Sequence, residues 1–125
     1  MTEPQVFPAG QQELKEFPFG RHANVTVWQG IGDAPGSMGA GYATYQGRFD
    51  WVLQYDAVYY FLEGTLTITH GERTYTAGVG DVMFLPRHAP VTYESPEGCK
   101  IFWAIYPGDW EQASDFSVAE RTTSP

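Results

Sequence analysis

The 125-residue sequence has few basic residues and no long apolar run. Seven lysines and arginines stand against fifteen aspartates and glutamates, so the net charge is −8. A protein that binds a phosphate backbone needs a clustered basic surface, and we therefore expect neither nucleic acid nor a membrane as a partner. No apolar run approaches the roughly 18–20 residues of a membrane-spanning helix.

The sequence also has little that points to an oxidising compartment. Cys99 is the only cysteine, so no disulfide can form within the chain. The first residues, MTEPQVFPAGQQELKEF, lack the basic and apolar regions of a secretion signal. We therefore expect a cytoplasmic protein.

Aromatic residues, glycine and proline are abundant. Twenty aromatic residues are more than the core of one small domain needs, and a pocket lining or a subunit interface is the ordinary place for the surplus. Fourteen glycines and nine prolines spread along the chain favour short strands joined by turns. No segment predicts a sustained helix.

The sequence predicts eight or nine short strands with turn residues between them, and this regular spacing predicts a sandwich or barrel. The first covers residues 24–30 and the last 99–107, with bends expected at Gly47 and Gly64. We expect residues 1–20 to form an N-terminal arm, 21–110 the barrel and 111–125 a polar C-terminal tail.

Two segments resemble the signature motifs of the cupin superfamily, whose members are metal-binding β-barrels. They are YDAVYYFLEGTLTI (residues 55–68) and AGVGDVMFLPRHAPVTY (residues 77–93). Gly64 matches the last glycine of the first motif, and Gly80 and Pro86 match the second. The string WVLQYDAVYYFLEG is similar to the ethanolamine-utilisation type of cupin. The resemblance implies an all-β fold, a single-domain antiparallel β-barrel of the jelly-roll type.

The resemblance also locates the positions at which cupins hold their metal. The histidine and glutamate positions of the first motif are occupied by Trp51, Leu53 and Ala57, and the histidine of the second by Val91. A divalent ion needs several nitrogen or oxygen donors at about 2.0–2.6 Å. We therefore expect no metal, and no other cofactor is indicated.

Strand alternation from these positions predicts which side chains point into the barrel. The expected lining is mostly apolar with two phenols: Trp51, Leu53, Tyr59, Phe61, Val91 and Tyr93. The phenols could orient a carbonyl, hydroxyl or carboxylate group of a ligand. Alternatively, the aromatic rings fill a barrel that binds no ligand.

Three further residues are candidates for chemistry near the barrel mouth. His88 stands where the second motif has glycine, and a histidine suits acid–base work near neutral pH. Asp56 either caps a turn or acts as a base. Arg48 could meet a carboxylate substrate. The candidate catalytic residues are Tyr59, Tyr93, His88 and Asp56, and the candidate substrate-binding residues are Trp51, Leu53, Phe61, Val91 and Arg48.

Three functions remain open at this point. The first is a small-molecule-binding cupin that acts as a metal-independent isomerase, cyclase or lyase on a small carbonyl or aromatic compound. The second is a non-catalytic binding or accessory protein. The third is a metalloenzyme with ligands outside the motifs. In each case we expect a homodimer, because small barrels with exposed strand edges and surplus aromatic residues tend to pair.

Overall fold

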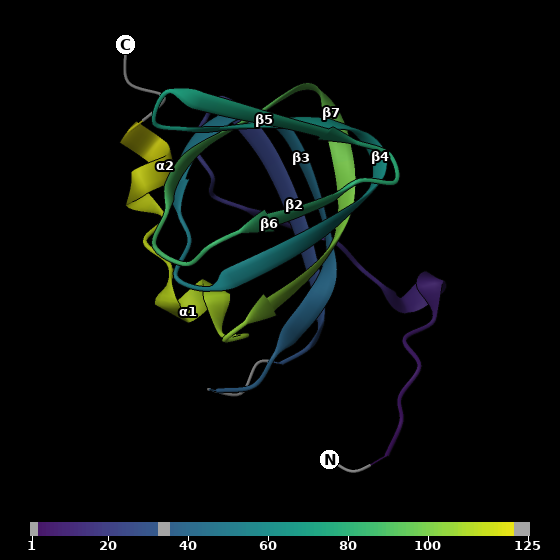
Figure 1. Ribbon diagram of the computed structural model, residues 1–125. Coiled ribbons are helices and arrows are strands. Elements are labelled where there is room, and N and C mark those ends of the chain that lie inside the picture. Colours follow the sequence, from purple (N-terminus) through teal and green to yellow (C-terminus); the bar gives the residue numbers. More distant parts are fainter. Residues whose placement is uncertain (1–2, 33–35, 122–125) are drawn as a thin grey trace.

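The computed structural model describes residues 3–32 and 36–121 (Figure 1). Residues 1–2 of the expected arm and 122–125 of the expected tail lie outside the described residues. The strands are β1 (Lys15–Phe17), β2 (Ala23–Ile31), β3 (Gly39–Val52), β4 (Asp56–His70), β5 (Arg73–Gly78), β6 (Val82–Leu85) and β7 (Pro90–Tyr106). A 3₁₀ turn, η1, covers Ala9–Gln11, and two short helices, α1 (Trp110–Ala113) and α2 (Ser117–Arg121), follow the last strand.

The strands of the described residues form one antiparallel sheet that curls into a barrel (Figure 1). Their order is β1-β2-β3-β7-β4-β5, and β6 pairs with β4 outside this path. The all-β antiparallel barrel expected from the sequence is therefore confirmed. The described helices are too short to cross a membrane.

Each of the three longest strands, β3, β4 and β7, was predicted from the sequence as two short strands. Gly47 lies within β3, Gly64 within β4 and Gly98 within β7, all with positive φ. The register shifts beside Gly47 and around Gly64, as it does where a β-bulge bends a strand without ending it. The interpretation of Gly47 and Gly64 as bends between separate strands was wrong, because a bulge and a turn both favour glycine at positive φ.

Alternation along β4 shows how the core forms. Ala57, Tyr59 and Phe61 are buried, whereas Val58 and Tyr60 between them are exposed. Successive side chains of a strand point to opposite faces, so the first set packs inside the barrel. Burying a side chain such as Phe61 contributes about 1.5–3 kcal/mol.

The arm and the tail both contribute to one end of the barrel. Within the expected arm, β1 pairs with β2, and Phe19 is buried in the core. From the expected tail, Phe116 packs its ring 5.3 Å from that of Phe19 and 5.2 Å from that of Trp51. The residues before β1 lie outside the barrel (Figure 1), where the ring of Phe7 is 5.7 Å from that of Trp28 on β2 and Val6 is 87% exposed.

We expect substitution of the two motif glycines, Gly64 and Gly80, to cost different amounts of stability. Both have positive φ, 72° for Gly64 and 89° for Gly80. A Cβ on Gly64 would lie 2.1 Å from the carbonyl oxygen of Gly98, whereas one on Gly80 meets open space. Backbone strain alone costs about 1–3 kcal/mol. We predict that Gly80→Ala loses stability in this range in urea unfolding and that Gly64→Ala loses clearly more or fails to fold; equal losses would contradict this account.

Candidate functional site

Four tyrosine side chains meet inside the barrel. The hydroxyl groups of Tyr59 and Tyr93 are 2.7 Å apart and share a hydrogen bond. The Tyr45 hydroxyl donates to that of Tyr59 at 3.4 Å. Beside them, Nε1 of Trp51 donates to the hydroxyl of Tyr55 at 3.1 Å. β3, β4 and β7 supply Tyr45, Tyr59 and Tyr93, so the sheet register fixes this cluster.

Aromatic rings fill most of the space around the cluster. The ring of Tyr93 stacks on that of Phe49 at 4.5 Å and 15°, and Phe19 lies 4.5 Å from Trp51. The cavity that is left measures about 30 Å³. A cavity needs about 10–15 Å³ to hold one water molecule, so the barrel interior as it stands has room for water-sized groups and does not fit a metabolite.

Burial keeps the phenols of the cluster protonated. Loss of solvent, followed by repulsion from the Tyr59 phenolate, raises the pKa of both Tyr45 and Tyr93 well above 10.0. Burial also raises the pKa of Tyr59, although hydrogen bonds with Tyr45 and Tyr93 partly offset it. These groups are therefore hydrogen-bond donors near neutral pH and do not act as general bases there.

One buried donor on the cavity wall has no partner. Nε1 of Trp103 is buried and makes no hydrogen bond to any described residue. Trp103 on β7 is paired with Tyr59 on β4, and both side chains line the cavity. Buried polar groups normally have a partner, so this wall suits one hydrogen-bond acceptor.

A larger concavity lies between β5 and β6. Both strands pair with β4, β5 along Thr65–His70 and β6 along Ala57–Tyr60. The groove between them measures about 550 Å³. Its apolar walls include Ile68, Ala77, Met83, Leu85 and Val91, and its polar groups include His70, Thr76 and Asp81.

Only some of the expected lining and binding residues reach the cavity or the groove. Trp51, Tyr59 and Tyr93 line the cavity, and Val91 lines the groove. Leu53 and Phe61 are fully buried among the core side chains. Arg48 points outward, where its Nε lies 3.7 Å from a carboxylate oxygen of Glu94.

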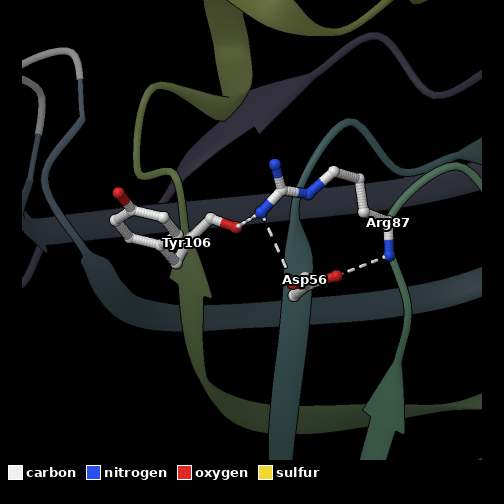
Figure 2. A network of polar contacts seen from close by, with 3 residues as sticks. All are labelled: Asp56, Arg87 and Tyr106. Atoms are coloured by element: carbon white, nitrogen blue, oxygen red, sulfur yellow. Dashed lines mark hydrogen bonds and ion pairs between the residues drawn. The ribbon is translucent and has the colours of Figure 1, made fainter.

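Asp56 and His88 line neither the cavity nor the groove. Figure 2 shows the Arg87 guanidinium between Asp56 and Tyr106. Asp56 accepts the backbone N–H of Arg87 at 2.8 Å and its Nη2 at 3.4 Å, and the same Nη2 donates to the carbonyl of Tyr106 at 3.2 Å. His88 is exposed, with its backbone N–H on the carbonyl of Leu53 at 2.7 Å. The structure therefore brings Tyr59 and Tyr93 together but leaves Asp56 and His88 apart from them.

Eight residues that line the cavity were missing from the sequence-based set, and they include Tyr45, Tyr55 and Trp103. The alternation that placed Trp51 and Tyr93 inside continues to Tyr45 along β3 and to Trp103 along β7. This signal was available in the sequence. No comparable signal marks the groove, because the spacing of β5 and β6 along β4 creates it.

The residues at the cupin ligand positions do not fit a metal ion. Leu53, Ala57 and Val91 carry no donor atom, and the Trp51 indole donates its only polar hydrogen to Tyr55. Among residues 3–32 and 36–121, no three histidine, cysteine, aspartate or glutamate residues are grouped so that they could hold one.

Comparison with known proteins establishes the family. The sequence model of the family described as ethanolamine utilisation protein EutQ matches residues 22–112. The chain belongs to the EutQ family. It is 33% identical over 81 residues to the Escherichia coli K12 protein named acetate kinase EutQ, and 34% identical over 62 residues to the protein of that name from Clostridioides difficile 630. These matches cover 64% and 50% of this chain, but only 35% and 40% of the relatives.

Solved structures of EutQ proteins share the fold. The Clostridium difficile protein aligns with a TM-score of 0.75 at 23% identity, covering 84% of this chain and 81% of that one. The Salmonella typhimurium LT2 protein aligns at 0.73 and 25%, covering 82% and 85%. The cupin domain of Schizosaccharomyces pombe Cnp3 aligns at 0.62 and 12%, covering 96% and 81%. The jelly-roll cupin fold is thereby confirmed.

The raised phenol pKa values predict a loss of stability at high pH. An unfolded tyrosine loses its proton near pH 10.0, whereas Tyr45, Tyr59 and Tyr93 keep theirs to higher pH while the barrel is folded. The contribution of these phenols to the free energy of unfolding is thus complete below about pH 10. Above that pH it declines, by up to about 1.4 kcal/mol per pH unit for each phenol. Urea unfolding across this range measures the decline.

Phenolate absorbance provides the control for this experiment. The chain has eight tyrosines, and we expect the buried ones to ionise only as the protein unfolds. Ionisation of all eight near pH 10 in a protein that stays folded would contradict the cluster.

Proposed function

We propose that this EutQ-family chain is a small-molecule-binding accessory protein in ethanolamine utilisation, and that its ligand binds in the groove between β5 and β6. The difference in volume between the two concavities carries the proposal. The groove measures about 550 Å³ and the barrel cavity about 30 Å³. Sites for small molecules span about 300–1,000 Å³, so only the groove has the required size.

The groove walls indicate the class of ligand. An apolar body would cover side chains such as Leu85, Met83 and Val91, gaining roughly 25 cal/mol per Å² of apolar surface removed from water. A polar group on the ligand would meet His70 or Asp81. His70 Nδ1 is bonded to the carbonyl of Pro90 at 2.9 Å, which leaves Nε2 for the ligand. A small molecule with an apolar body and one or two oxygen or nitrogen atoms fits both demands.

The geometry favours binding without chemistry over metal-independent isomerisation, cyclisation or lysis. These reactions need a base within reach of the substrate. Of the acid–base candidates expected from the sequence, the phenols of the cavity are protonated near neutral pH, Asp56 is bonded to Arg87, and His88 lies outside both concavities. The groove itself contains His70 and Asp81, so the binding experiment also measures turnover. The metalloenzyme hypothesis has no grouped donors in the part of the chain that the structure describes.

The kinase activity in the names of the relatives is not part of this proposal. The matched segments cover about a third of those proteins. Phosphoryl transfer relies on lysine, arginine and magnesium ions that hold the phosphate oxygens. The described walls of the groove and the cavity contain no lysine or arginine.

We also propose that the protein acts as a homodimer in the cytoplasm. The single cysteine, Cys99, is buried with a free thiol, which suits a reducing compartment. Exposed apolar side chains on the outer face of the sheet support self-association.

A bulky side chain in the groove is predicted to abolish binding. Ala89 and Ala23 are both partly buried and packed against the core, but only Ala89 lines the groove. A fragment set of single-ring alcohols, amides and acids, with ethanolamine and acetate added, is screened by thermal shift. We expect hits on the wild type, with affinity reduced at least about tenfold, or 1.4 kcal/mol, in Ala89→Trp and unchanged in Ala23→Trp.

Two results would overturn the groove as the binding site. One is equal loss of binding in both tryptophan variants. The other is hits that survive Ala89→Trp but disappear in Tyr93→Phe, which would place the ligand in the barrel interior. Incubating the hits with the protein for turnover separates a binding protein from an enzyme.

A further inference from the structure

The groove between β5 and β6 carries a carboxylate without a basic counterpart. Asp81 is the one acidic side chain among the described residues that line it, and none of these residues is lysine or arginine. Two arginines lie close to the groove in the sequence. Arg87 is paired with Asp56, and Arg73 does not line the groove. No cation of the described walls therefore offsets the charge of Asp81.

Asp81 has one carboxylate oxygen to offer a ligand. It stands directly before β6, where its carbonyl oxygen accepts the N–H of Phe61 on β4 at 3.1 Å. Its Oδ2 accepts the backbone N–H of Gly78 at 2.8 Å, which holds the side chain against the end of β5. Its Oδ1 makes no hydrogen bond or ion pair with any residue that the structure describes. An ionised carboxylate only accepts hydrogen bonds, so Oδ1 fits a donor on the ligand.

Apolar and aromatic side chains lie on the same face of the sheet as the groove. Tyr75 and Ala77 on β5 are paired with Ile68 and Leu66 on β4, and paired residues point to the same side. Because Ile68, Leu66 and Ala77 are buried, the Tyr75 ring, which is 48% exposed, lies on the groove side of β5. An aromatic face attracts an ammonium group, and the buried Met83 adds apolar surface.

His70 is an acceptor as well. Its Nδ1 lies 2.9 Å from the carbonyl oxygen of Pro90, so this nitrogen carries a proton, and Nε2 of the neutral ring then accepts. His70 is paired with Arg73 at one end of β5, and Asp81 is bonded to Gly78 at the other. The two ends of this six-residue strand are roughly 17 Å apart. A small ligand therefore reaches only one of these two acceptors, and Asp81 is the carboxylate.

We propose that the ligand of the groove is a small organic amine whose ammonium group binds Oδ1 of Asp81. This assignment rests on the groove as the binding site, proposed above, and names the class of ligand. A protonated amine supplies both N–H donors and a positive charge, and charge-assisted hydrogen bonds are roughly twice as strong as neutral ones. A carboxylate or phosphate ligand would meet Asp81 as a like charge, in a chain whose net charge is −8.

Three probes with one phenyl body compare the polar groups. Phenethylamine, phenethyl alcohol and phenylacetate carry an ammonium, a hydroxyl and a carboxylate group. NMR titration of isotope-labelled protein measures their affinities, and the amide of Gly78 reports on Asp81 because the two are bonded. We expect the amine to bind about fivefold more tightly than the alcohol, which is what a well-formed exposed ion pair contributes. We expect phenylacetate to bind more weakly than either.

A pair of matched variants tests the contact with Asp81. Asp81→Asn removes the charge but keeps an oxygen for the N–H of Gly78, whereas Glu16→Gln removes the same charge from β1, outside the groove. We expect the preference for the amine over the alcohol to disappear in Asp81→Asn and to persist in Glu16→Gln. Circular dichroism confirms that both variants are folded. The ranking of the probes on the wild type tests the ligand class even where Asp81→Asn does not fold.

The possible failures are distinguishable. An alcohol or carboxylate that binds in the groove as tightly as the amine would overturn the amine and leave the groove intact as the binding site. Equal loss of the preference in both variants would overturn the contact with Asp81. Shifts that map to the barrel interior, or no binding by any of the three probes, would overturn the groove and the ligand class together.

Discussion

The hydrogen bond between Tyr59 and Tyr93, with Phe49 stacked against Tyr93, determines what the barrel interior is able to do. These rings occupy the space in which a cupin normally presents metal ligands, and the ligand positions themselves are taken by Trp51, Leu53, Ala57 and Val91. Because their burial raises the phenol pKa values, the interior also lacks a general base near neutral pH. The proposed function accordingly places the binding site on the surface of the barrel and not in its interior.

The proposed ligand groove and the exposed apolar side chains of the outer face both involve β4. Its middle exposes Val58 and Tyr60 on the outer face of the sheet, while Ile68 near its end contributes to the groove. β6 also contributes to both, through Val82 and Phe84.

The sequence predicts the buried face well and the connections poorly. Strict alternation along β4 was enough to place Tyr59 and Phe61 inside, because it depends only on the two-residue period of a strand. Gly47 and Gly64 were misplaced, since the residue type alone does not distinguish a bulge from a turn. The partner of Asp56 was also out of reach: Arg87 is 31 positions away, and only the fold brings it close.

A crystal structure of the protein with a bound fragment tests the central claim most directly. The account predicts fragment density between β5 and β6, against Leu85 and Val91, with the Tyr59–Tyr93 hydrogen bond unchanged. Density inside the barrel, with that hydrogen bond broken and the fragment on Nε1 of Trp103, would contradict it. The interior would then be a binding site, and the aromatic rings its lining.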